Sequence, residues 1–169
     1  MLCVIAVFKL NMKKTKKEYN NLLAEMVYID KYRQLNNSRH HGISRFDHIK
    51  RVGYLSFLIA KIFKLDVSTV TRGALLHDFF TEEDVEKYTK KEWHRLHPQI
   101  ALANSRQYFN LNKIEENIIS SHMFPICKTK PIYKESHVVA TADKLVAVYE
   151  FTRFNLIAYT YFIFISFIH

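Results

Sequence analysis

Apolar side chains recur along most of the chain at steps of three and four residues, the spacing of one face of an α-helix. The pattern predicts a succession of helices separated by short polar segments. The ranges expected to be helical are about 13–35, 45–64, 67–78, 98–109, 112–122 and 135–150. Residues 79–93 are charged and less regular, so we expect only a solvated turn of helix there. The sequence therefore predicts an all-α protein, a bundle of about six helices.

Polar residues mark where several of these helices begin. Asp66 can accept hydrogen bonds from the free amides of the first turn that follows it. Asn112 and Glu115 have the spacing of a capping box. Proline is well tolerated at the first helical position, so the dipeptide His97-Pro98 predicts a helix start with His97 at the cap.

The composition supports long helices and one domain. The chain has 169 residues but 3 glycines and 3 prolines, which is few for a turn-rich sheet protein. The net charge of +9 favours anionic partners such as nucleotides, nucleic acid or an acidic membrane surface, without choosing among them. The 2 cysteines, Cys3 and Cys127, show no metal-binding or disulfide pattern, which fits a reducing, cytoplasmic compartment.

Two terminal stretches differ from the domain expected at residues 13–153. Residues 1–12 are an N-terminal extension, and their lysine follows the apolar part, unlike the charge of a secretory signal. Residues 154–169 form a hydrophobic C-terminal segment, shorter than the ~20 residues of a membrane span. We favour packing of this segment on the domain or in a homodimer interface. Membrane contact through a surface anchor is the second choice and a true span the third.

Several polar residues lie where the helical pattern expects apolar ones. His77 and Asp78 follow one another at the end of an apolar run, where both can reach one cation. His48 and His122 are in register with the apolar faces of their helices, as ligands or as satisfied core residues. Asp143 shares a face with valines, and a carboxylate buried there is costly unless it is paired or binds metal.

Five separated elements follow one another along the chain: a histidine, a His-Asp pair, two more histidines and an aspartate. In order they are His48, His77-Asp78, His97, His122 and Asp143. This order resembles the HD-domain superfamily of metal-dependent phosphohydrolases, and the resemblance extends from about Phe46 to Glu150. It implies an HD helical bundle with one or two divalent ions. Mn, Fe, Mg, Ni and Zn all suit imidazole and carboxylate ligands.

The resemblance also implies a role for individual residues. The first metal would be held by His48, His77, Asp78 and Asp143, and the second by His97 and His122, with Asp78 bridging. Asp78 would thereby be catalytic, and Glu82 is a candidate acid/base residue for the attacking water. Arg45 and Lys144 would contact the substrate phosphate. The plainer alternatives are a surface ion pair for Arg45 and a solvated helical turn for Glu82.

The expected function is hydrolysis of a phosphate ester or anhydride in a small phosphorylated substrate, a nucleotide, by metal-activated water. Among standalone HD proteins, the four-histidine pattern resembles the dinucleoside tetraphosphate hydrolases. The chain lacks a Gly-Tyr-Pro element after its His-Asp pair, which argues against cleavage of cyclic di-GMP. The alternative is a non-catalytic HD module that senses a nucleotide or associates with membrane or RNA through its basic surface.

Overall fold

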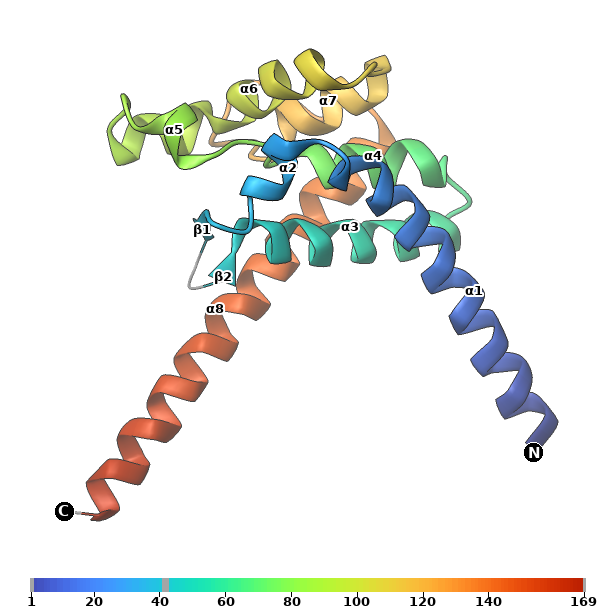
Figure 1. The fold of residues 1–169 in the computed structure, drawn as a ribbon, viewed down its shortest axis with the longest axis vertical. Helices are drawn as coiled ribbons and strands as arrows, with labels where there is room; N and C mark the ends of the chain where they lie inside the picture. Colours follow the sequence, from blue (N-terminus) through green and yellow to red (C-terminus); the bar gives the residue numbers. More distant parts are fainter. Residues whose placement is uncertain (1, 41–42, 169) are drawn as a thin grey trace.

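The computed structural model describes the backbone of residues 2–40 and 43–168, and the side chains of residues 13–38 and 43–153 (Figure 1). The helices are α1 (Leu2–Val27), α2 (Asp30–Gln34), α3 (Arg45–Ile62), α4 (Val67–Leu76), α5 (Glu82–Val85), α6 (Lys90–Tyr108), α7 (Lys113–Ser121) and α8 (Lys134–Ile168). Two-residue strands, β1 (Arg39–His40) and β2 (Ile43–Ser44), pair antiparallel before α3. Because six of the described helices are substantial and two are short, the predicted all-α bundle is confirmed.

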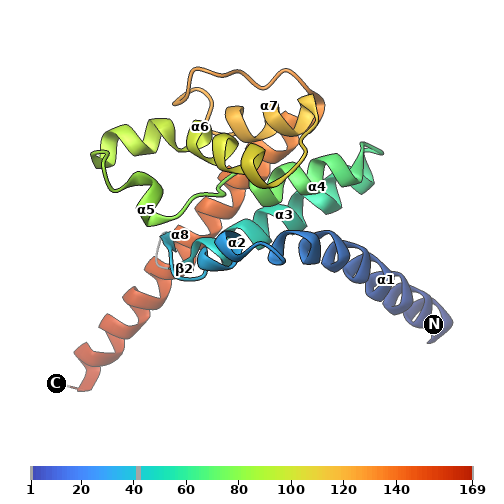
Figure 2. The same cartoon turned by 45° about the horizontal axis from the view of Figure 1, so that its top comes forward.

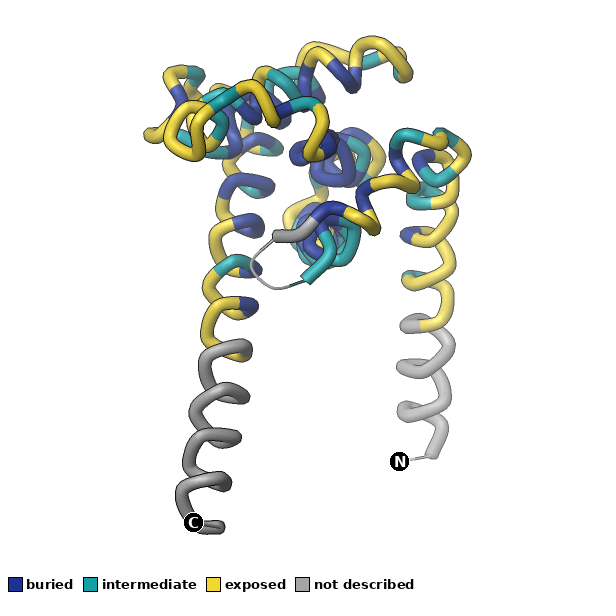
Figure 3. The backbone as a smooth tube through the Cα atoms, turned by 60° about the vertical axis from the view of Figure 1, so that its left-hand side comes forward, coloured by how far each residue is buried: buried dark blue, intermediate teal, exposed yellow. Residues whose placement is uncertain are grey.

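The central helix α3 packs against α4 and α8, while α7 packs against α4, α6 and α8. Helices α6 and α7 form a layer over α3 and α4 (Figure 2). Val52 of α3, Ala74 of α4, Ile118 of α7 and Val146 of α8 belong to one buried apolar cluster. Buried positions gather where the helices meet, and exposed positions lie on their outer faces (Figure 3). This packing brings the inner faces of the long helices to one region.

Two predicted helix starts are confirmed in detail. Before α4, the Oδ1 atom of Asp66 accepts a hydrogen bond from the Thr69 amide at 3.1 Å. Before α7, Asn112 and Glu115 form the expected capping box, in which each side chain accepts from the amide of the other residue. These caps set the starts of α4 and α7, whose C-terminal ends carry two of the predicted metal-binding elements.

The single helix expected at 13–35 is wrong, because the chain breaks between α1 and α2. Ile29 has an extended backbone, with φ −84° and ψ 123°. The turn places Tyr32 in the core, fully buried, where its hydroxyl donates to the Leu75 carbonyl at 2.9 Å. Tertiary packing of Tyr32 thus overrides the helical periodicity of the sequence.

The helix start expected at Pro98 is also wrong. Helix α6 begins eight residues earlier, at Lys90, and Pro98 lies inside it. Thr89 and Glu92 form a capping box that starts the helix, a signal that the apolar pattern did not reveal. The stretch 79–93, expected to hold a solvated turn of helix, contains the short helix α5 and also the first turn of α6.

The terminal segments are described by their backbone alone. Residues 2–12 continue α1 and residues 154–168 continue α8. The contacts expected of the C-terminal segment, with the domain, in a homodimer or at a membrane, lie outside the described side chains. The boundaries of the 13–153 domain stay a prediction. Over the part of the chain whose placement is described, none of the helices combines the length and the apolar character that crossing a bilayer requires.

Candidate metal centre and adjoining cavity

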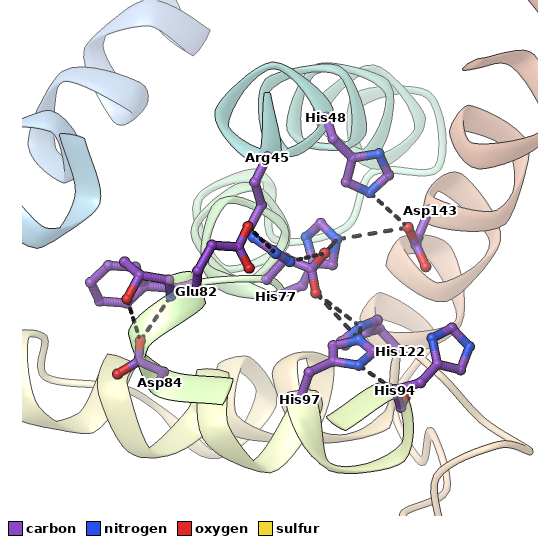
Figure 4. Close-up of polar contacts among 12 residues, drawn as sticks. Arg45, His48, His77, Glu82, Asp84, His94, His97, His122 and Asp143 are labelled. Atoms are coloured by element: carbon purple, nitrogen blue, oxygen red, sulfur yellow. Dashed lines mark hydrogen bonds and ion pairs between the residues drawn. The ribbon is translucent and has the colours of Figure 1, made fainter. Parts of the chain in front are cut away.

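Histidine and aspartate side chains from five helices meet in the interior of the bundle (Figure 4). The members of this His/Asp cluster are His48 on α3, His77 and Asp78 at the end of α4, His97 on α6, His122 at the end of α7, and Asp143 on α8. All are buried, the most exposed being Asp143 at 8%. The structure therefore brings together all six residues that the sequence nominated as metal ligands.

Asp78 lies between two groups of imidazoles. Its Oδ1 atom is 3.4 Å from Nε2 of His97 and 3.5 Å from Nε2 of His122. Its Oδ2 atom is 3.9 Å from Nε2 of His77 and 3.9 Å from Nη1 of Arg45. A carboxylate placed in this way can offer one oxygen to each of two neighbouring sites.

Asp143 approaches the cluster from α8. Its Oδ1 atom is 3.1 Å from Nε2 of His48 and 3.7 Å from Nε2 of His77. On the other side of Asp78, the Nε2 atoms of His97 and His122 are 3.0 Å apart. All four histidines thus direct Nε2 toward the two aspartates.

Three histidines are held in this orientation by backbone carbonyls. The Nδ1 atoms of His77, His97 and His122 lie within hydrogen-bonding distance of the carbonyls three residues earlier, at 2.7, 3.0 and 2.8 Å respectively. For His77 and His122 that carbonyl lies in the last turn of a helix, where no intrahelical amide is available. For His97 it is the His94 carbonyl, which Pro98 cannot satisfy because it has no N–H. An Nδ1–H donated to each carbonyl leaves the lone pair of Nε2 facing the cluster.

The protonation states of two imidazoles and of the two aspartates suit a cation. Burial lowers the pKa of His77 and lowers that of His97 to about 4, so both imidazoles are neutral at pH 7. Burial alone would raise the pKa of Asp78 and Asp143, but the surrounding imidazoles hold both below the usual range. Burial opposes protonation of His48, yet its hydrogen bonds to Asp143 and Glu150 raise its pKa to about 10.

The residues present fit a divalent ion. Within the described part of the chain, Nε2 of His77 and Oδ1 of Asp78 are buried without a hydrogen-bond partner, which native interiors rarely leave uncompensated. Three sets of side chains each bring three ligand atoms within 4.8 Å of one another. They are His48–His77–Asp78, His77–His122–Asp143 and Asp78–His97–His122. Since two of these sets share Asp78, the cluster has donors for one ion or for two.

A cavity of about 210 Å³ adjoins the His/Asp cluster, between α6, the segment after α7, and α8. The cluster contributes Asp78, His97, His122 and Asp143 to its lining, and the walls include Trp93, His94, Met123, Phe124, Pro125, Ile126, Lys144 and Ala147. Lys144 Nζ donates to the carbonyls of Phe124 and Ala140, at 3.3 and 3.4 Å. The cavity therefore combines mainly apolar walls with one ammonium group and the two aspartates.

Two predicted residues lie beside the cluster but do not line this cavity. Arg45 is 2% exposed, and its guanidinium lies 3.7 Å over the Phe80 ring. Its Nη1 faces Asp78, while its Nη2 is 3.6 Å from Oε1 of Glu82. Glu82 stands at the start of α5 with its side chain 58% exposed, and its carboxylate faces the guanidinium of Arg45 (Figure 4). Their proposed contacts with phosphate and water remain predictions.

Sequence reasoning missed three residues at the site. Trp93 and His94 line the cavity, and neither was nominated from the sequence. The capping box at Thr89 could have placed both on one helix with His97. Glu150, which is bonded to His48, follows Asp143 by seven residues, so the helical repeat could have placed it on the same face.

The HD domain family matches residues 45–148, which is more than half of the chain. The chain therefore belongs to the HD domain family. The buried His/Asp cluster of this HD domain is consistent with the metal-dependent phosphohydrolases of that family.

The chain is also similar to Ribonuclease Y of Pseudothermotoga lettingae, with 33% identity over 107 residues. The aligned region covers 63% of this chain and 19% of that protein, so the chain spans less than a fifth of the relative's length. No solved structure matches.

Proposed function

We propose that the protein hydrolyses a phosphate ester or anhydride of a nucleotide, with one or two divalent ions held by the His/Asp cluster. One observation carries this proposal: four Nε2 atoms converge on Asp78 and Asp143 beside a cavity. A bound divalent ion would lower the pKa of water toward neutrality and offset charge on the phosphoryl oxygens. Mn, Fe, Mg, Ni and Zn remain the candidate ions.

The distances suggest how the ligands divide. His48, His77, Asp78 and Asp143 would hold the first ion, and His97 and His122, with Asp78 bridging, the second. The shared position of Asp78 supports this division, because one of its oxygens faces His77 and the other faces His97 and His122. The carbonyl bonds of the histidines keep their Nε2 atoms in place, so little reorganisation is needed on binding.

The cavity suggests where a nucleotide would lie. A phosphate at the His/Asp cluster would be near Lys144, whose Nζ could exchange a carbonyl acceptor for a phosphate oxygen. Trp93 and Phe124 offer aromatic surfaces on which a nucleobase could stack. Lys144 is therefore our proposed phosphate contact.

Arg45 acts on the cluster through Asp78 in this proposal. Its buried guanidinium provides a positive charge behind the carboxylate and links it to Glu82. Two of its nitrogens, Nε and Nη1, have no hydrogen-bond partner within the described residues, which leaves them capacity for a phosphate oxygen. The phosphate contact of Arg45 and the acid–base role of Glu82 are retained as proposals, and so is a cytoplasmic location.

A second candidate substrate is RNA. The similarity to a protein named Ribonuclease Y supports a phosphodiester of RNA as the substrate, and the net charge of +9 is compatible with nucleic acid as well as with nucleotides. The same cluster would serve, since the reaction is again attack of water on a phosphorus atom. A labelled single-stranded RNA therefore belongs in the substrate panel.

Product analysis after metal loading tests the proposal. The metal-stripped protein is loaded with Mn²⁺ and incubated with nucleoside mono-, di- and triphosphates, dinucleoside tetraphosphates and a labelled RNA strand. We expect turnover of at least one substrate, and its loss in Asp78→Asn. Asp84→Asn is the matched control, because Asp84 pairs with Lys31 and Asn104 outside the cluster. Metal-loaded protein with no product from any substrate would instead support the non-catalytic sensor.

A further inference from the structure

Glu150 is a fully buried carboxylate next to the His/Asp cluster. Its side chain has 0% exposure, and it lies two residues beyond the region matched by the family. One oxygen, Oε2, is 2.8 Å from Nδ1 of His48. The other, Oε1, accepts a hydrogen bond from Nη1 of Arg51 at 2.8 Å. Burying such a charge is costly unless it is paired, and both oxygens are paired here.

Glu150 and Asp143 hold the two sides of one imidazole. They lie seven residues apart on α8, about two turns and ~10 Å along one helix face. His48 of α3 reaches between them, with Nε2 at 3.1 Å from Asp143 and Nδ1 at 2.8 Å from Glu150. The bond of Nδ1 to Glu150 therefore fixes Nε2 as the nitrogen of His48 that faces the cluster.

His48 differs from the other three histidines in the partner of its Nδ1 atom. The Nδ1 atoms of those three bond to backbone carbonyls that receive no hydrogen bond from a backbone amide, because the helix ends there or a proline follows. His48 lies in the first turn of α3, where the carbonyls accept intrahelical amides, so a side chain has to take their place. A carboxylate in this role also makes the opposite ring nitrogen a stronger donor to a metal.

We propose that Glu150 is a positioning residue that orients His48 and strengthens Nε2 as a metal ligand, with Arg51 paired to the other oxygen of the buried carboxylate. The inference rests on the proposed metal site. Loss of such a hydrogen-bond partner typically weakens metal binding ~10–100-fold. The other oxygen of Glu150 anchors α8 to α3 through Arg51, so the same residue ties the helix carrying Asp143 to the helix carrying His48.

The test measures Mn²⁺ affinity by titration of the metal-stripped full chain. Glu150→Gln keeps the shape and an acceptor oxygen but removes the charge, and Glu150→Ala removes both. The matched control is Glu115→Gln, because Glu115 is also a buried carboxylate paired with an arginine, Arg72, but lies on α7 away from His48. Thermal unfolding of each metal-free variant measures the structural cost separately.

We expect affinity to fall at least ~10-fold in Glu150→Gln, further in Glu150→Ala, and less than ~2-fold in the Glu115 control. Combined with His48→Ala, Glu150→Gln should add less than ~2-fold, since its effect passes through the missing imidazole. In the Zn²⁺-loaded protein, the Nδ1 proton of His48 should be visible by NMR and should exchange faster in Glu150→Gln.

Three results would overturn the inference: Glu150→Gln with wild-type Mn²⁺ affinity, an equal loss in the Glu115 control, or an undiminished loss in the His48→Ala background. If Glu150→Ala does not fold, the isosteric Gln variant still decides among these results. Wild-type protein that binds no metal would refute the proposed function itself. If instead the wild type binds Mn²⁺ and the Glu150 variants bind it equally well, only the inference about Glu150 is refuted.

Discussion

Replacing Asp143 by asparagine should remove the stabilisation that a divalent ion gives the protein. The Oδ1 atom of Asp143 lies 3.1 Å from Nε2 of His48 and 3.7 Å from Nε2 of His77, so the ion would lose an anionic ligand next to two imidazoles. Asparagine keeps the shape of the side chain but not its charge. We expect the metal affinity to fall ~100-fold, since even an outer hydrogen-bond partner accounts for ~10–100-fold.

The magnitude follows from mass action. An ion present at 100 times its Kd stabilises the folded state by ~2.7 kcal/mol. For a chain of this length that corresponds to a rise in Tm of ~5–11 °C. A 100-fold weaker site at the same ion concentration gives ~0.4 kcal/mol, or ~1–2 °C.

Thermal unfolding with and without Mn²⁺ measures this difference. Asp84→Asn is the control, since Asp84 is a partly buried carboxylate bonded to Lys31, Thr81 and Asn104 rather than to the cluster. We expect the full metal-induced shift in wild type and in Asp84→Asn, and a shift of no more than ~2 °C in Asp143→Asn. A shift in Asp143→Asn equal to that of wild type would refute the assignment of Asp143 as a ligand.

Three further predictions address the cavity, the packing and the protonation of the cluster. Lys144→Ala should raise KM ~10-fold with little change in kcat, because its exposed ammonium would exchange the Phe124 carbonyl for the bound phosphate. An unchanged KM in steady-state kinetics would argue against that contact. Gly73→Ala should lower the free energy of unfolding by ~1–3 kcal/mol in urea titrations, because the added Cβ would lie 2.7 Å from Cδ1 of Ile118. An unchanged free energy of unfolding would contradict the tight packing of α4 against α7. Burial lowers the pKa of His97 to about 4, below its unfolded value, so its contribution to the stability of the metal-free protein is complete above pH ~6.5 and is lost as the pH falls toward 4. Metal-free His97→Gln should therefore lose less stability than wild type between pH 6.5 and 4 in urea titrations, and an equal loss would contradict this explanation.

The sequence was sufficient to predict the central helices, because periodicity and caps act locally. The registers of His48 on α3 and of Asp143 on α8 follow from the 3.6-residue repeat, and Asp66 marks the start of α4 through its own side chain. The family resemblance supplied the idea that such distant residues converge. Periodicity alone shows which face of a helix is apolar, not which helices meet.

Other features depend on contacts that the sequence does not display. The break before α2 exists because Tyr32 reaches a carbonyl of α4, and local pattern contains no signal for that bond. Pro98 indicates a helix start by its ordinary preference, yet it lies inside α6, where His97 takes the carbonyl that the proline leaves free. The role of Glu150 required knowing that α3 and α8 are adjacent.

The central claim is that one cation-binding site is formed by residues that are far apart in the sequence. The most direct test is an anomalous difference map from a crystal of the Mn²⁺-loaded protein, recorded near the manganese absorption edge. We predict one or two peaks beside Asp78, with Nε2 of His48 and His77 and an oxygen of Asp143 among the ligands. Peaks bound by other residues, or no peak within the His/Asp cluster, would contradict the claim.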